Sequence, residues 1–166
     1  MTYKIPAERL RELFDYDAAS GVVKWRVRKA NCIHVGDVVG WEDSNGYLKV
    51  TIDGLHYFVH NVIWAWTTGK WPIATVDHEN LIKRDNRWLN LREATHSENC
   101  ENRPVRSDNK TGLKGVTWRA DASRWQARIV VNGKRRSLGM FDDKGQAHAA
   151  YAAAAMRHHG QFARIV

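Results

Sequence analysis

The sequence has few cysteines and no long apolar run. Its 166 residues include only Cys32 and Cys100, which form no Cys-x-x-Cys pair. A disulfide framework and a cysteine-rich zinc site are therefore excluded, and a reducing, intracellular setting is expected. The longest apolar stretch, residues 149–156, is far shorter than the roughly 20 residues that cross a bilayer. No charged-then-apolar leader follows Met1, so neither membrane insertion nor secretion is expected.

Acidic residues are scarce in the last part of the chain. Residues 1–102 hold 13 basic and 14 acidic side chains, whereas residues 103–166 hold 13 basic and four acidic ones. The last 64 residues thus carry a net charge of +9, which is more than the formal net charge of +8 of the whole chain. Such a basic block with interleaved aromatic residues is either a solubilising face or a module that binds phosphates. We favour nucleic acid, because the charge accompanies a matching sequence pattern.

Turn and cap residues divide the chain into short elements. Apolar residues at three- and four-residue spacing predict helices over residues 6–15 and 57–68, the second ended by Gly69. Alternating segments and turn formers predict strands over residues 22–27, 37–42 and 47–53. The charged, turn-rich segment 103–111 is expected to be a linker between domains at 1–102 and 112–166. The predicted fold class is α+β.

Residues 76–102 carry the candidate chemistry. They contain the adjacent pair Asp77-His78, then Asn90, then Asn99. A capping box that starts at Thr95 predicts a helix with Asn99 one turn inside it. The segment therefore reads as strand, loop, strand and helix, an arrangement in which the Asp-His pair and the helix Asn can converge.

Convergence of these groups would suit phosphodiester hydrolysis. Asp77 and Asn99 offer two hard oxygen donors and leave most of a Mg²⁺ shell open for water and phosphate oxygens. A neutral His78, with an unperturbed pKa near ~6.5, could accept a proton from the attacking water. Taken singly, each residue is usually a surface or capping residue, but their order beside a basic module favours the site. His60 is either a buried, satisfied histidine or a support for the site, and we favour the support.

The stretches FVHNVIWAW, GKWPIATVDHEN and DNRWLNLREATHSENCEN resemble the HNH endonucleases of phages and mobile introns. The preceding LFDYDAASGVVKWR is similar to the region before that motif in many phage members. The resemblance implies a ββα-metal core at about residues 58–102. It also implies that His78 is the general base, that Asp77 and Asn99 bind Mg²⁺ or Mn²⁺, and that the central Asn90 steadies the loop and orients the histidine.

The last third of the chain predicts a second small fold. Strand-like segments are broken at residues 120–123 and at Asn132-Gly133, a strong hairpin signal. Asp143 and Gln146 form a capping pattern, after which small residues predict a helix packed closely on the sheet and ended near Gly160. Three antiparallel strands on one helix would leave the other sheet face free. The residues expected on that face, and therefore at DNA, are Arg119, Arg124, Trp125, Arg128, Lys134, Arg135 and Arg136.

Through its GVTW, RWQARI and LGMF elements, this segment resembles the Apetala-two (ethylene-response-factor) type of DNA-binding domain. The resemblance implies a sheet in the major groove, with Arg and Trp side chains contacting bases and phosphates. For Trp118 and Trp125, packing against the helix is an equal alternative.

The sequence as a whole predicts a metal-dependent, homing-type endonuclease of a phage or mobile element that hydrolyses double-stranded DNA. It would act in the cytoplasm of a bacterial host, as a monomer or a weak homodimer, without contact with a membrane. Two alternatives remain open. A sequence-specific regulator would bind DNA without cleaving it, and a structured-RNA binder would use the same charge.

Overall fold

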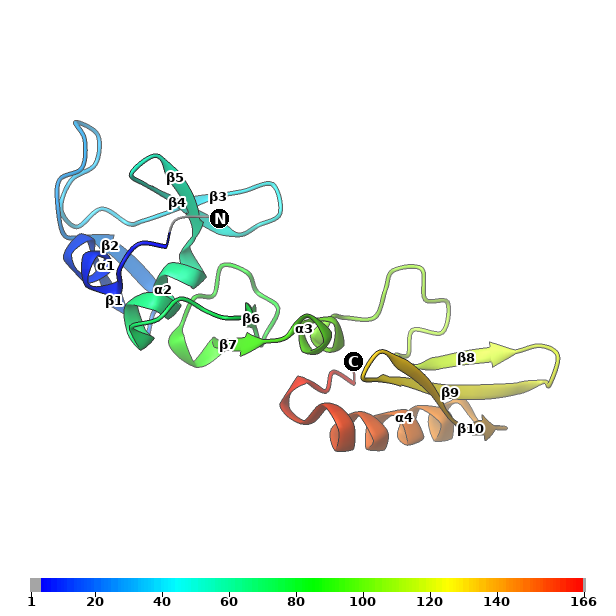
Figure 1. The fold of residues 1–166 in the computed structure, drawn as a ribbon. Helices are drawn as coiled ribbons and strands as arrows, with labels where there is room; N and C mark the ends of the chain where they lie inside the picture. The colour runs from blue at the N-terminus through cyan, green and yellow to red at the C-terminus, as the bar shows by residue number, and fades with distance from the viewer. Residues whose placement is uncertain (1–3, 166) are drawn as a thin grey trace. The chain divides into compact units, whose positions relative to one another are not determined.

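The computed structural model describes residues 4–165, and the chain divides into two compact units, residues 1–94 and residues 95–166 (Figure 1). Both combine helices with small antiparallel sheets. The predicted α+β class is therefore confirmed. Each unit is described by itself below.

The first unit contains three small antiparallel sheets, ordered β1-β2, β3-β4-β5 and β6-β7. Its elements are α1 (Ala7–Leu13), β1 (Phe14–Asp17), β2 (Val22–Trp25), β3 (Trp41–Glu42), β4 (Leu48–Ile52), β5 (Leu55–Phe58), α2 (Val59–Thr68), β6 (Thr75–His78), the 3₁₀ turn η1 (Trp88–Asn90) and β7 (Leu91–Ala94). Gly69 ends α2 in the left-handed conformation (φ 77°), where a residue without a Cβ is favoured.

Several predicted elements of this unit are shorter than expected: the predicted strand 37–42 is a strand only at Trp41–Glu42, and the predicted strand 22–27 only at Val22–Trp25. The first helix ends at Leu13, because Phe14 begins β1 and pairs with Trp25 of β2. Phe14 is fully buried, so tertiary packing decides its conformation rather than the helical spacing that it shares with earlier residues. The second helix begins at Val59, because residues 55–58 pair with β4 as strand β5.

The core of the first unit joins α1, α2 and the three sheets. Its buried members are Ile5, Leu10, Leu13, Phe14, Val23, Trp25, Val39, Val50, Ile52, Tyr57, Val59, Val62, Ile63, Ala65, Val76 and Leu91. Because α2 supplies four of these residues, from Val59 to Ala65, and β6 and β7 supply Val76 and Leu91, the core fixes the strand that carries the Asp-His pair.

The second unit is one three-stranded sheet, ordered β10-β9-β8, with a helix along one face (Figure 1). Its elements are α3 (His96–Asn102), β8 (Val116–Arg119), β9 (Arg124–Val131), β10 (Lys134–Phe141), α4 (Lys144–His159) and the 3₁₀ turn η2 (Gly160–Phe162). Asn132 and Gly133 both have positive φ, 53° and 72°, as a two-residue type I′ hairpin turn requires. The predicted hairpin is confirmed.

Small residues let α4 approach the sheet closely. Ala147, Tyr151, Ala154 and Ala155 are the buried residues of the helix, and they pack with Val116, Ala127, Ile129 and Val131 of the sheet. The residue that faces the helix just before β8 must also be small. Gly115 has φ 72°, and a Cβ there would overlap the Tyr151 ring. The predicted small-residue face of the helix therefore packs against a sheet side that also has a small residue, Gly115, at the contact.

The compact second unit starts at Thr95, earlier than the predicted boundary at residue 103. Two contacts explain this, since both join α3 to the C-terminal fold. Glu101 Oε2 lies 2.7 Å from His159 Nδ1 at the end of α4. The Lys114 ammonium donates to the backbone carbonyls of Glu101 and Arg103. The expected linker, residues 103–111, contains neither helix nor strand.

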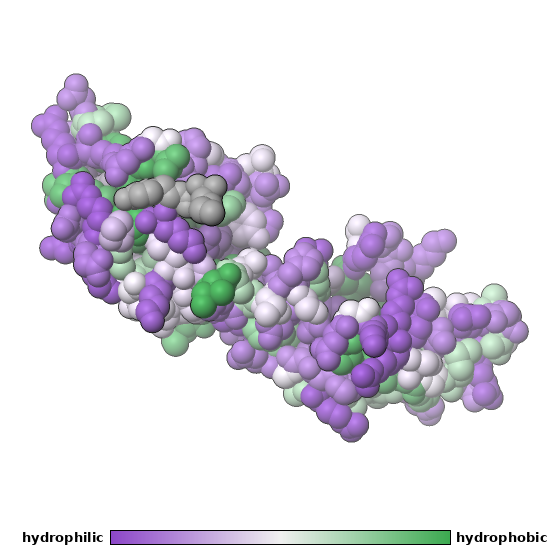
Figure 2. Space-filling view, viewed as in Figure 1, coloured by the Kyte–Doolittle hydropathy of each residue, from purple (hydrophilic) through white to green (hydrophobic). Residues whose placement is uncertain are grey.

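Within residues 4–165, no helix is both long and apolar enough to cross a bilayer. Hydrophilic side chains predominate over the visible face of each unit (Figure 2).

Candidate active site

The β6–β7 hairpin places the Asp77-His78 pair at the end of a buried strand. The register pairs Asp77 with Arg92 and His78 with Leu91. Both functional side chains are almost enclosed, with exposed fractions of 6% for Asp77 and 4% for His78. A buried Asp-His pair is unlike the surface dipeptide that is common in proteins, because burying polar groups is unfavourable unless each has a partner.

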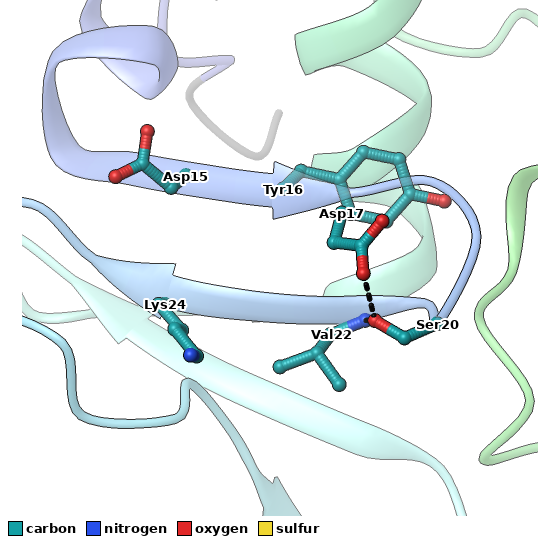
Figure 3. Close-up of a pocket in the computed structure, with 6 residues that line it drawn as sticks. All are labelled: Asp15, Tyr16, Asp17, Ser20, Val22 and Lys24. Carbon is teal, nitrogen blue, oxygen red and sulfur yellow. Dashed lines mark hydrogen bonds between the residues drawn. The ribbon is translucent and has the colours of Figure 1, made fainter.

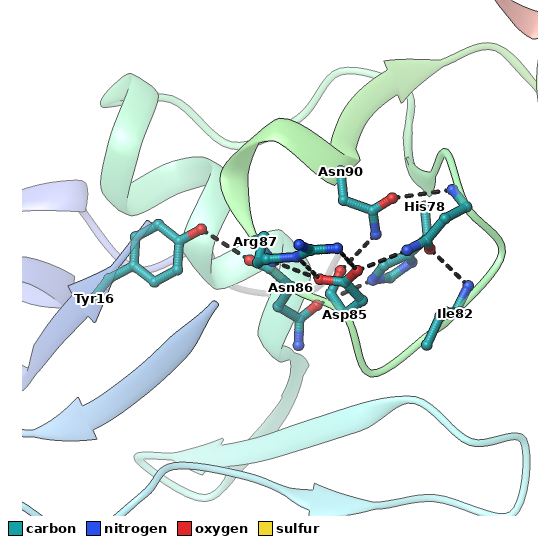
Figure 4. A network of polar contacts seen from close by, with 8 residues as sticks. Tyr16, His78, Ile82, Asp85, Asn86, Arg87 and Asn90 are labelled. Carbon is teal, nitrogen blue, oxygen red and sulfur yellow. Dashed lines mark hydrogen bonds and ion pairs between the residues drawn. The ribbon is translucent and has the colours of Figure 1, made fainter. Parts of the chain in front are cut away.

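Asn90 holds the loop between these strands closed. Its Oδ1 accepts a hydrogen bond from the Asn80 N–H (3.0 Å). Its Nδ2 donates to the Asp85 carbonyl (2.7 Å), and both Asn90 and Asp85 are labelled in Figure 4. In addition, the Glu79 N–H donates to the Asn90 carbonyl (2.9 Å). Asn90 thereby links both ends of the loop that follows His78.

The His78 ring is hydrogen-bonded to the side chain of Asn86. Asn86 Oδ1 lies 3.0 Å from His78 Nε2, and Asn86 is 1% exposed. Because an amide oxygen only accepts hydrogen bonds, Nε2 carries the proton and the basic lone pair lies on Nδ1. Sequence reasoning missed Asn86, which stands in the charged run KRDNR and has no pattern of a buried residue.

The β1–β2 hairpin supports the backbone of Asn86. The Tyr16 hydroxyl donates to the Asn86 carbonyl (2.8 Å; Figure 4), and the Trp88 N–H donates to the carbonyl of Ala18 (3.1 Å). Gly21 of the hairpin turn lies close to this backbone, because a Cβ added at Gly21 would lie 2.6 Å from the Asn86 carbonyl carbon. The N-terminal hairpin is thus part of what positions His78.

Burial keeps the two histidines of the site neutral. Desolvation lowers the pKa of His60 to about 3, with the nearby His78 ring acting in the same direction. Desolvation also lowers the pKa of His78, although its hydrogen bond to Asn86 and the charge of Asp77 oppose the shift. His60 packs edge-on against His78, with ring centroids 5.1 Å apart, and stacks on Phe58. The expected support from His60 therefore has a physical basis in this contact.

Asp77 faces a cation. Arg92 donates from Nε and Nη2 to Asp77 Oδ2, at 3.2 and 3.1 Å. Both side chains are largely buried, 12% exposed for Arg92 and 6% for Asp77. The environment of the carboxylate therefore already accommodates positive charge, and its hard oxygens suit a divalent cation. Sequence reasoning missed Arg92, because the partner of Asp77 follows only from the strand register.

The other predicted metal ligand, Asn99, lies on α3. The helix begins with the predicted capping box, in which the Thr95 hydroxyl accepts from the Glu98 N–H and the Glu98 side chain accepts from the Thr95 N–H. Asn99 is partly exposed, one turn inside the helix. Because α3 belongs to the second unit, the pairing of Asn99 with Asp77 stays a prediction.

Clusters of metal-binding side chains are absent from the described chain, the region of Asp77 and His78 included. Among residues 4–165, no group of three or more His, Cys, Asp or Glu side chains is placed to hold a cation. A pocket of about 280 Å³ lies on the β1–β2 hairpin (Figure 3). Its Asp17 carboxylate is used locally, accepting from the Ser20 hydroxyl (2.6 Å) and the Ala19 N–H (3.0 Å). These bonds close the hairpin turn.

The free face of the second unit's sheet carries arginines. Residues paired across antiparallel strands share a face, and the buried residues Ala127, Ile129 and Val131 mark the helix side of β9. The opposite face carries four of the predicted DNA-contacting residues: Arg119, Arg124, Arg128 and Arg135. Two of them have exposed carboxylate partners, Asp121 for Arg119 and Asp142 for Arg124.

The expected display of all seven candidates on that face is wrong for three. Trp125 lies on the helix side, where its ring packs against the cluster that contains Val116, Ala127 and Ala147, and Lys144 Nζ lies 5.7 Å from its ring centroid. Lys134 and Arg136 pair with the buried Val131 and Ile129, so they point to the helix side, although both are exposed on the edge strand. Their contact with DNA stays a prediction.

The β6–β7 region lies within a segment of the chain that matches a known protein family. Residues 57–100 match the HNH endonuclease family model. The matched segment, about a quarter of the chain, runs from β5 to α3 and contains His60, Asp77, His78, Asn90 and Asn99.

Two individual proteins are also similar. Protein 3.8 of Escherichia phage T7 is 28% identical over 107 residues, which cover 64% of this chain and 88% of that protein. A solved structure of the HNH homing endonuclease I-HmuI, concerned with its DNA binding and cleavage, has a TM-score of 0.41 and 16% identity and covers 88% of this chain and 84% of its own.

Proposed function

We propose that this protein is a metal-dependent HNH endonuclease that hydrolyses phosphodiester bonds in double-stranded DNA. The observation that carries the proposal is the buried, neutral His78 beside Asp77, held by Asn86 within the segment that matches the HNH endonuclease family model. A buried histidine with one nitrogen fixed by a hydrogen bond is arranged as a general base.

His78 would activate the attacking water. Its Nε2–H donates to Asn86 Oδ1, which leaves the proton-accepting lone pair on Nδ1. Because the lowered pKa keeps the imidazole neutral at physiological pH, Nδ1 can take the proton from water as the oxygen attacks phosphorus. Asn90 steadies the loop through Asn80 and Asp85, and the orientation of His78 comes from Asn86.

Asp77 and Asn99 would hold Mg²⁺ or Mn²⁺. When bound there, the cation would supply Lewis-acid stabilisation of charge on the phosphate and the leaving 3′ oxygen. Asp77 contributes a buried carboxylate and Asn99 a carboxamide oxygen, a donor set with the hard chemistry that these cations prefer.

The second unit would bind the duplex and keep the protein on it, as an Apetala-two type domain. The arginine-bearing face of β8–β10 is the proposed DNA surface, since its four guanidinium groups can bind phosphates or guanine edges in the major groove. The protein would thus be a homing-type enzyme of a phage or mobile element, acting in the bacterial cytoplasm as a monomer or weak homodimer.

Incubation with supercoiled plasmid tests the function. We expect conversion to nicked or linear DNA with Mg²⁺ and none with EDTA. Binding without conversion under both conditions would contradict the nuclease proposal and favour the regulator. Competition between duplex DNA and duplex RNA of equal length tests the remaining alternative, the structured-RNA binder. An RNA binder would be displaced from a labelled duplex at a lower concentration of RNA than of DNA.

A further inference from the structure

The contact between Asp77 and Arg92 has a consequence beyond the proposed hydrolysis. Arg92 lies directly across the β6–β7 ladder from Asp77, and two of its nitrogens donate to the same carboxylate oxygen. With 12% and 6% of the two side chains exposed, little water screens the pair. The carboxylate that would hold a divalent cation thus already interacts with a buried cation that belongs to the chain.

A guanidinium and a divalent ion on one carboxylate oppose each other. Repulsion between positive charges at contact distance is large where water is excluded, so the two cations compete for the carboxylate. Removing the positive partner of a buried carboxylate is, however, strongly destabilising. The protein therefore needs a positive group at this carboxylate, and Arg92 is a positive group of the chain itself that contacts it.

We propose that Arg92 is a built-in counter-ion that the divalent cation must displace from Asp77, so that metal binding is an exchange and Arg92 sets the metal affinity. This inference rests on the proposed function, because it takes Asp77 as a metal ligand. A purely structural role for the pair, joining β6 to β7, predicts no such effect on metal affinity.

Mn²⁺ affinity measured by isothermal titration calorimetry on the full-length protein tests the exchange. Arg92→Gln removes the charge but keeps an N–H donor for Asp77, and it should bind Mn²⁺ at least about tenfold more tightly than the wild type. Mn²⁺ should also raise the melting temperature of this variant by more than it raises that of the wild type. Arg9→Gln is the matched control, because Arg9 is an exposed arginine of the same unit, paired with Glu12; its Mn²⁺ affinity should equal that of the wild type.

Two further variants make every outcome decisive. If Arg92→Gln does not fold, Arg92→Lys retains the charge but loses the fork-shaped contact, and we expect a several-fold gain in Mn²⁺ affinity. Equal or weaker Mn²⁺ binding in the variant that folds overturns the exchange. Asp77→Asn should abolish Mn²⁺ binding. If it binds like the wild type, the metal assignment of the proposed function fails, whereas loss in Asp77→Asn without a gain at Arg92 refutes only the role of Arg92.

Discussion

Acidification should destabilise the first unit through His60. This side chain is 5% exposed and packs among the rings of Phe58, Tyr47 and His78, and its folded-state pKa is about 3. In the unfolded chain the pKa returns to about 6.5. Below pH 6.5, His60 therefore binds a proton in the unfolded state but stays neutral in the folded state. The stability that the folded protein owes to a neutral His60 is fully present above pH 6.5 and is lost as the pH falls toward 3.

The size of the effect follows from the two pKa values. Between pH 8 and pH 5, linkage at one such histidine lowers the free energy of unfolding by about 2 kcal/mol. Urea denaturation at both pH values, followed by tryptophan fluorescence, gives the wild-type loss. His60→Gln removes this titration, so its loss between the same pH values should be smaller by about 2 kcal/mol.

The control is His56→Gln, the same substitution at an exposed histidine of β5 in the same unit. Equal losses in the wild type and His60→Gln would refute the argument, because they would mean that His60 is protonated at similar pH in the folded and unfolded states. His78 acts in the same direction but is present in all three proteins.

Substitutions at three further positions test the site, its support and the proposed DNA surface. Asn86→Ala should slow cleavage by about 10- to 100-fold with DNA affinity unchanged, whereas Asn86→Asp, which keeps an acceptor for His78, should recover most of the rate; an unaltered rate in the alanine variant would contradict the positioning role. Gly21→Ala should lower the free energy of unfolding by about 1–3 kcal/mol, because φ is 77° and the new Cβ would lie 2.5 Å from the Arg87 nitrogen; urea denaturation with no change in midpoint would show that this contact relaxes easily. Arg135→Ala should weaken DNA binding and reduce the salt slope by about 1, measured by fluorescence anisotropy, and a slope equal to that of the wild type would place the interface elsewhere.

Local sequence signals predicted the elements that local chemistry decides. The capping box at Thr95 begins α3 as expected, and the positive φ angles of Asn132 and Gly133 make the predicted hairpin. Phe14 shows the limit of such signals. Its spacing suits a helix, but pairing with Trp25 and complete burial place it in a strand.

The candidate site was predictable only in part, for a related reason. Motif order predicted Asp77, His78 and Asn90, and the structure places them in one hairpin and its loop. The partners that set their electrostatics, Arg92 and Asn86, depend on strand register and on how a charged loop folds back into the core. Neither property has a signature in a single sequence.

Single-turnover cleavage by His78→Ala tests the central claim most directly. With saturating Mg²⁺ and a duplex substrate, loss of the general base should slow cleavage by about 10²- to 10⁴-fold, while the dissociation constant for DNA, measured in parallel, stays within a few fold of the wild-type value. Cleavage at the wild-type rate by the folded variant would contradict the assignment of His78 as the base.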